Sequence, residues 1–138
     1  MAEPTPLAGA VARVGDRWTL LVVEALLRGP ARFGDLEAAV QGIASNVLSD
    51  RLRRLEAEGL LVSLPYSDRP PRREYRLTDA GAYLAGALRL LTAWGARSAG
   101  GAVGPEHRTC GTPLETRWFC PTCDRPVGDD EGPELSFA

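Results

Sequence analysis

Residues 45–59 read SNVLSDRLRRLEAEG. At about 3.6 residues per helical turn, Leu48, Leu52 and Leu55 fall on one side of a helix, and polar side chains centre on the other. Gly59 suits the left-handed residue that commonly ends a helix. The stretch therefore predicts an amphipathic helix with one buried face and one exposed polar face.

The segment before this helix predicts a partner for it. Residues 33–40 form a shorter amphipathic stretch, which Gln41-Gly42 breaks, and Ser45 is positioned to be the N-cap of the helix that follows. Two helices joined by a tight connection that contains glycine are typical of a helix-turn-helix. We therefore expect residues 33–59 to form this motif.

After Gly59 the hydrophobic period changes from helical to extended. Residues 60–66 and 74–77 are predicted as strands of a hairpin, and residues 67–73 are predicted as its tip. The tip is rich in arginine and contains Arg69, Arg72 and Arg73. A helix-turn-helix followed directly by such a hairpin is the arrangement of a winged helix. The predicted fold class is therefore mainly α with a small β-hairpin wing, a winged helix-turn-helix, followed by a short C-terminal zinc-ribbon-like segment.

Helices are also predicted on both sides of this unit. Residues 8–14 and 18–27 read as two helices with Gly15-Asp16 between them, and Thr78 is placed to cap a helix over 79–97. We assign residues 6–97 to one winged helix-turn-helix domain, residues 105–127 to the zinc-ribbon-like segment, and residues 128–138 to an acidic flexible tail.

The exposed face of the 45–59 helix carries groups that can reach base edges in a major groove. The predicted DNA-binding residues are Ser45, Asn46, Ser49, Asp50, Arg53 and Arg54 on the helix, and Arg69, Arg72 and Arg73 on the wing. Asp50 is unfavourable beside phosphates unless it accepts a hydrogen bond from a cytosine amine or pairs with Arg53 or Arg54. An ordinary solvated helix face and a solvated turn are the alternative interpretations.

Charge is unevenly distributed along the 138 residues, whose net charge is −2. Residues 1–100 carry 13 arginines and 11 acidic residues, whereas residues 101–138 carry 3 arginines and 7 acidic residues. Within the first part, residues 51–76 hold seven arginines and four acidic residues, which makes a local basic patch. The start of the chain lacks the basic and apolar pattern of a secretory signal, so we expect a cytoplasmic protein without a membrane partner.

Four stretches resemble the HxlR-type transcriptional regulators. They read GDRWTLL at 15–21, GPARFGDL at 29–36, LSDRLRRLEAEGL at 48–60 and PPRREYRLTDAG at 70–81. They occur in the order and spacing of the family, and the resemblance covers roughly residues 6–95. It implies a bacterial winged helix-turn-helix regulator that binds near-palindromic operator DNA as a homodimer.

The resemblance also implies that the N-terminal helix and the long helix after the wing build the dimer, which agrees with the apolar stripe from Tyr83 to Trp94. Many members carry a Cys-Pro pair thirteen residues before the tryptophan, and in some of them the thiol senses aldehydes or oxidants. Here the pair is Thr5-Pro6, thirteen residues before Trp18. Thiol sensing at that position is therefore not expected.

The only histidine and all three cysteines lie close together near the C-terminus. His107 and Cys110 are separated by two residues, as are Cys120 and Cys123, with nine residues between the pairs. Three thiolates and one imidazole suit a closed tetrahedral site for structural Zn²⁺. Free cytoplasmic thiols, a redox-active Cys120–Cys123 pair and an iron–sulfur cluster are the alternatives.

The sequence favours a regulator over two other classes of protein. A winged-helix and zinc-ribbon adaptor that binds another protein without reading DNA is the alternative function. An enzyme is not expected, because we find no histidine-based dyad, no glycine-rich phosphate loop and no paired catalytic carboxylates.

Overall fold

Two helices open the chain in the computed structural model, which describes residues 3–100 and 104–128. Helix α1 covers Pro6–Val14 and helix α2 covers Arg17–Leu26. The Asp16 carboxylate caps α2 by accepting hydrogen bonds from the backbone N–H groups of Trp18 and Thr19, at 3.2 and 3.1 Å. The prediction of two helices on either side of Gly15-Asp16 is confirmed.

Helices α3 (Phe33–Ala39) and α4 (Ser45–Ala57) form the predicted helix-turn-helix. Gly42 lies in their connection with a φ of 83°, a conformation that other residues rarely adopt. The N-cap of α4 is Ala44, which lacks a capping side chain, so the assignment of Ser45 as N-cap is wrong. Ser45 is the first helical residue, and its hydroxyl instead donates a hydrogen bond to Glu37 on α3.

Three strands form an antiparallel sheet in the order β1-β3-β2. One strand precedes the helix-turn-helix in the chain, and two follow it. Its strands are β1 (Ala31–Arg32), β2 (Leu61–Asp68) and β3 (Pro71–Leu77). Sequence reasoning gave only a two-stranded hairpin and missed β1. The predicted seven-residue tip is also wrong, because Ser67 pairs with Arg72 and Asp68 with Pro71, which leaves Arg69-Pro70 as the turn.

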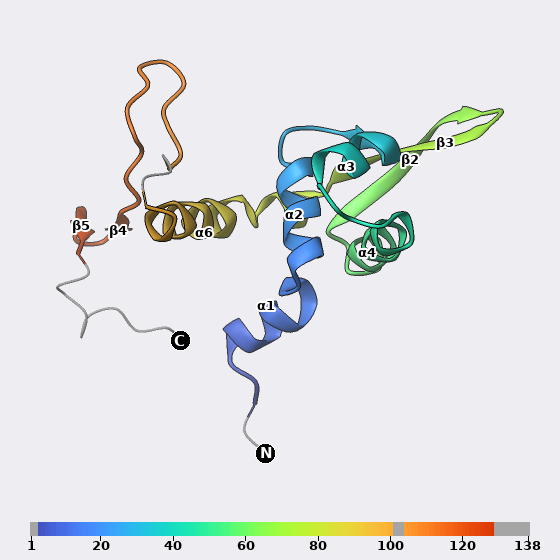
Figure 1. The fold of residues 1–138 in the computed structure, drawn as a ribbon. Coiled ribbons are helices and arrows are strands. Elements are labelled where there is room, and N and C mark those ends of the chain that lie inside the picture. Colours follow the sequence, from blue (N-terminus) through green and yellow to red (C-terminus); the bar gives the residue numbers. More distant parts are fainter. Residues whose placement is uncertain (1–2, 101–103, 129–138) are drawn as a thin grey trace. The chain divides into compact units, whose positions relative to one another are not determined.

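The hydrophobic core lies between the helices and the base of the hairpin. It comprises Val14, Val22, Val23, Leu26, Leu36, Val40, Ile43, Leu48, Leu52, Leu55, Leu60 and Leu61. Leu48, Leu52 and Leu55 are at most 2% exposed, which confirms the predicted buried face of α4. Figure 1 shows α2, α3 and α4 around the base of the β2–β3 hairpin, whose far end projects beyond them as a wing.

The single helix predicted over residues 79–97 is interrupted. Thr78 caps α5 (Asp79–Ala82) as expected, but the chain turns at Tyr83–Leu84 before α6 (Ala85–Ser98) begins. Gly81 is buried so close to β2 that a Cβ atom there would lie 2.0 Å from the Leu60 carbonyl oxygen. This close approach ties the first helical turn to the sheet and separates it from the rest.

The chain divides into two compact units at Leu88/Arg89, within α6. The second unit contains a two-stranded antiparallel hairpin of β4 (Trp118–Cys120) and β5 (Arg125–Val127). Of the predicted tail, residues 129–138 lie outside the described residues. Among the helices in the described part of the chain, none is long and apolar enough to cross a membrane.

Candidate nucleic-acid interface

The outer face of α4 carries the predicted base-reading side chains. Asn46 and Arg53 are exposed, whereas Ser49 and Asp50 are half-buried. The guanidinium Nε of Arg53 lies 3.4 Å from the carbonyl oxygen of Ser49, one turn earlier, so the side chain runs back along the helix. Arg54 is exposed in the last turn. The helix therefore offers a polar surface of amide, hydroxyl and guanidinium groups.

Arg51 holds Asp50 in place. Its Nη1 lies 2.5 Å from Asp50 Oδ2, and its Nε lies 2.9 Å from Oδ1 of Asp16, the N-cap of α2. Asp50 therefore pairs with Arg51, its neighbour in sequence, rather than with Arg53 or Arg54, the two arginines considered as possible partners. Burial raises the pKa of Asp16, but hydrogen bonds from Thr19 and Arg51 outweigh it and bring the pKa to about 2. The Asp16 carboxylate is thus charged at neutral pH.

A second ion pair joins α4 to the N-terminal helix. Arg13 in the last turn of α1 lies with its Nε 2.6 Å from Oε2 of Glu58, the C-cap residue of α4. Helix α4 is accordingly connected to the corner between α1 and α2 at two points, near its middle through Arg51 and at its C-terminal end through Glu58.

The three wing arginines occupy different positions along the hairpin. Arg69 is in the turn, and Arg72 is exposed beside it on β3. Arg73 lies farther from the turn, and its guanidinium donates hydrogen bonds to the hydroxyl and carbonyl oxygens of Ser63, at 2.7 to 3.2 Å. Its placement at the tip is therefore wrong.

Ser63 continues this connection to α4. Its hydroxyl donates to Oε1 of Glu56 on α4 at 2.8 Å, and its backbone N–H lies 3.2 Å from the same oxygen. Arg73, Ser63 and Glu56 thus form one chain of hydrogen bonds from β3 through β2 to α4. In the free protein this network holds the base of the wing against the helix.

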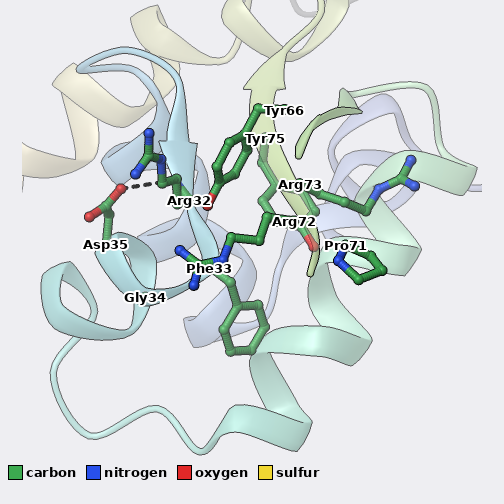
Figure 2. Close-up of a pocket in the computed structure, with 9 residues that line it drawn as sticks. All are labelled: Arg32, Phe33, Gly34, Asp35, Tyr66, Pro71, Arg72, Arg73 and Tyr75. Carbon is green, nitrogen blue, oxygen red and sulfur yellow. Dashed lines mark hydrogen bonds between the residues drawn. The ribbon is translucent and has the colours of Figure 1, made fainter. Parts of the chain in front are cut away.

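A groove of about 530 Å³ lies between the start of α3 and the wing. Figure 2 shows Arg32, Phe33 and Asp35 on one side of this groove and side chains of β2 and β3 on the other. The Arg32 guanidinium stacks over the Tyr66 ring at 4.4 Å, while its backbone N–H donates to Asp35 at 3.0 Å. Arg72 and Arg73 of β3 also line the groove, so three arginines from two elements border it.

Sequence reasoning missed Arg32 and Tyr66 as members of this surface. Arg32 lies next to the wing because β1 pairs with β3, with Ala31 opposite Tyr75 and Arg32 opposite Glu74. A two-residue strand has no periodicity of its own, so the residues around Arg32 give no signal of this pairing. The cation–π contact with Tyr66 depends on it.

The predicted metal ligands meet in pairs. His107 Nδ1 lies 3.3 Å from Cys110 Sγ, and Cys120 is hydrogen-bonded with Cys123. None of the three cysteines forms a disulfide. Within residues 3–100 and 104–128, no cluster of three or more metal-ligating side chains is assembled. The structure therefore contains two separate pairs of predicted ligands in the second unit, His107 with Cys110 and Cys120 with Cys123.

Large apolar side chains are exposed on two helices. On α1 these are Leu7 and Val11, and on the α5–α6 stretch they are Tyr83, Leu90, Leu91 and Trp94. Tyr83 is 90% exposed and Trp94 is 67% exposed. Such side chains are usually covered in a working protein, so both helices offer surface for association.

Comparisons with known proteins agree with this geometry. The family model described as HxlR-like helix-turn-helix matches residues 13–101. An uncharacterized HTH-type transcriptional regulator of Mycobacterium tuberculosis is 41% identical over 129 residues, which cover 91% of this chain and 81% of that protein. The regulator YvaP of Bacillus subtilis, also uncharacterized, is 41% identical over 85 residues, covering 62% of this chain and 79% of YvaP.

Solved structures share the fold. A protein of Porphyromonas gingivalis W83 assigned to the MarR family has a TM-score of 0.64 at 30% identity, covering 69% of this chain and 93% of its own. The redox regulator HypR in its reduced form has a TM-score of 0.66 at 26% identity, covering 70% and 95%. The transcription factor PA1607 has a TM-score of 0.72 at 29% identity and covers 91% and 90%, so that similarity extends into the second unit.

Proposed function

Because this chain belongs to the HxlR family of helix-turn-helix transcriptional regulators, we propose that it binds operator DNA as a homodimer and thereby controls transcription. The observation that carries the proposal is the polar outer face of α4, which lies beside an arginine-bearing wing. A major groove admits an α-helix, and an adjacent hairpin can reach the flanking phosphates. The protein would act in the cytoplasm, where bacterial DNA is found.

We assign different tasks to the helix and the wing. Asn46 can pair with adenine, and Arg53 can pair with guanine or a phosphate. The other helix residues of the interface are Ser45, Ser49, Asp50 and Arg54. Because Asp50 shares Arg51 with Asp16, its charge is partly compensated, so the carboxylate costs less beside DNA than an unpaired one and can select for a cytosine amine.

On the wing, Arg69 and Arg72 are free to reach phosphates or a minor groove, since both are exposed at the far end of the hairpin. Arg73 contributes by fixing the base of the wing to α4 through Ser63 and Glu56. Arg32, at the other border of the groove, adds a further cation for the DNA backbone.

The second copy of the chain is proposed to cover the exposed apolar faces of α1 and α6. Burying an exposed Leu, Phe or Met side chain contributes about 1.5–3 kcal/mol, so Leu7, Val11, Leu91 and Trp94 together can support a dimer. Sedimentation of the wild type and of Val11→Glu and Trp94→Glu checks this: we expect dimers for the wild type and monomers for the variants.

Salt-dependent gel shifts test DNA reading. The probe is the intergenic DNA beside the protein's own gene or a site selected from a random pool, with random DNA as competitor. Arg53→Ala is expected to weaken the specific site by about 1–3 kcal/mol and to relax base preference. Arg72→Ala is expected to weaken all sequences alike and to lower the salt slope by about one.

Arg28→Ala is the matched control, because Arg28 is an exposed arginine outside the α4 and wing surface. It should leave both affinity and salt slope unchanged. Equal losses for Arg53→Ala and Arg28→Ala would contradict the assignment of α4 as the reading helix. A folded wild-type protein that selects no sequence from the random pool would favour the protein-binding adaptor instead.

A further inference from the structure

The second unit contains two consecutive turns, each closed by antiparallel pairing. In the first turn, Glu106 bridges Pro113, and the Leu114 N–H donates to the Pro105 carbonyl at 2.8 Å. In the second turn, strands β4 and β5 pair up to Cys120 opposite Arg125. We call residues 107–111 and 120–124 the first and second knuckle.

In both knuckles, the second side chain of the pair is followed by a residue in the left-handed conformation. The His107 carbonyl accepts hydrogen bonds from the N–H groups of Cys110 and Gly111, at 3.2 and 2.7 Å. Gly111 then has a φ of 69°, and Asp124, directly after Cys123, has a φ of 52°. Asp124 is the one residue other than glycine with a positive φ among the described residues.

The spacing within the first knuckle is close to that of two ligands on one ion. Two ligands at about 2.1 Å (nitrogen) and 2.3 Å (sulfur) from zinc, at the tetrahedral angle, lie about 3.6 Å apart. His107 Nδ1 and Cys110 Sγ are 3.3 Å apart, within a few tenths of an ångström of this value. In the second knuckle, the sulfur of Cys120 is in contact with Cys123 and with the backbone N–H groups of Cys123 and Thr122.

The unit also lacks the usual means of stability. From Arg89 onward, no large apolar side chain of the described residues is buried, and Leu114, Trp118 and Phe119 are between 52% and 57% exposed. A segment of this size without a core normally depends on a disulfide or a structural metal. The cysteines form no disulfide, and their sequence context is that of a metal site.

We propose that the two knuckles close on a single Zn²⁺ ion, which His107 Nδ1 and the sulfur atoms of Cys110, Cys120 and Cys123 coordinate within one chain. Each of the three S–H groups loses its proton to solvent on binding, and the ion exchanges its water ligands for the four protein atoms. The segment between the knuckles, residues 112–119, must bend to bring the two pairs together, so metal binding and folding of this unit are coupled. The proposal does not depend on DNA binding by the first unit.

Cobalt titration of the full-length, reduced, metal-free chain tests this site. We expect one Co²⁺ per chain, the visible absorption of tetrahedral cobalt, a near-ultraviolet thiolate band, and displacement of cobalt by Zn²⁺. Cys110→Ser and Cys123→Ser should each lower the thiolate band by about one third, because two of three thiolates remain. His107→Asn should keep the thiolate band and weaken binding.

Asp124→Asn is the matched control, since it removes a carboxylate beside the second knuckle and asparagine also tolerates a positive φ. It should leave cobalt stoichiometry and spectrum unchanged. Far-ultraviolet circular dichroism of every variant verifies that the helices of the first unit are intact, so that loss of metal is not misread as loss of fold.

Mixing two double variants tests whether the site lies within one chain. One carries His107→Asn and Cys110→Ser, and the other carries Cys120→Ser and Cys123→Ser. If the mixture restores tetrahedral cobalt binding, the ligands come from two chains and the proposal is wrong. Octahedral cobalt, a bound iron–sulfur chromophore, or a Cys120–Cys123 disulfide that forms in air and leaves zinc binding unchanged would also overturn it.

Discussion

The two units of this chain are held together in different ways. Up to Leu88, a continuous apolar core joins α2, α3, α4 and the base of the sheet. From Arg89 onward, the described residues form the larger part of α6, turns and short strand pairs, and they bury no large apolar side chain. The first unit therefore owes its stability to area removed from water, whereas the second relies on local hydrogen bonds and, as proposed, on a metal.

The largest expected difference between the units comes from the same substitution made in each. Leu48→Ala removes a side chain that is 0% exposed, and it should lower the free energy of unfolding by about 2–5 kcal/mol, because a cavity remains in the core. Leu114→Ala in the second unit removes one that is 54% exposed and should change it by less than about 0.5 kcal/mol. Chemical denaturation followed by circular dichroism measures both. Equal costs would show that the second unit has a core of its own.

Two glycines on either side of the helix break sharpen the comparison. Gly81→Ala places a Cβ 2.0 Å from the Leu60 carbonyl oxygen, so we expect a loss of about 1–3 kcal/mol of stability. Gly86→Ala, on α6, meets no atom within 4 Å and should stabilise the protein by about 0.4–1 kcal/mol. Thermal unfolding compares the two. A neutral Gly81→Ala would mean that α5 is not fixed to the sheet.

A substitution at the base of the wing should change the free energy of unfolding by less. Ser63→Ala removes the hydroxyl that links Arg73 to Glu56, and a loss of about 0.5–1.5 kcal/mol is expected for such a hydrogen bond. Ser98→Ala is the control, because its hydroxyl only donates to the Trp94 carbonyl on the exposed face of α6. If the two variants unfold alike, the wing is not anchored through Ser63.

The smallest effect concerns the pH dependence of stability. The pKa of Asp16 is lowered from 3.8 to about 2 in the folded chain, so its contribution is fully present above about pH 4 and is lost as the pH falls toward 2. Asp16→Asn should therefore be less stable than the wild type at pH 6, and the difference should shrink at pH 2. Urea unfolding at the two pH values measures it. Asp68→Asn, at the exposed end of the wing, controls for the loss of one charge.

Periodic features of the fold were predictable from the sequence, and features that depend on distant pairing were not. The spacing of Leu48, Leu52 and Leu55 predicted the buried face of α4, because helical geometry alone determines which side chains share a face. Strand β1 was missed, since two residues become a strand only by pairing with Tyr75 and Glu74 more than forty positions away.

The candidate site shows the same division. Exposure of Asn46 and Arg53 followed from the helical period. The partners of Asp50 and Arg73 could not be predicted in this way. Asp50 pairs with Arg51, and Arg73 bonds to Ser63, because the folded chain brings these atoms together. The interruption at Tyr83–Leu84 was also hidden, since the apolar stripe runs on through residues that do not continue one helix.

Two ion pairs connect α4 to the corner between α1 and α2. Arg13 contacts Glu58 at one end of α4, and Asp16 contacts Arg51 near its middle, so a tilt of α4 would strain this corner. If the proposed dimer packs through α1, the crossing angle of the two N-terminal helices would set the distance between the two copies of α4, and with it the spacing of operator half-sites that the proposed regulator accepts.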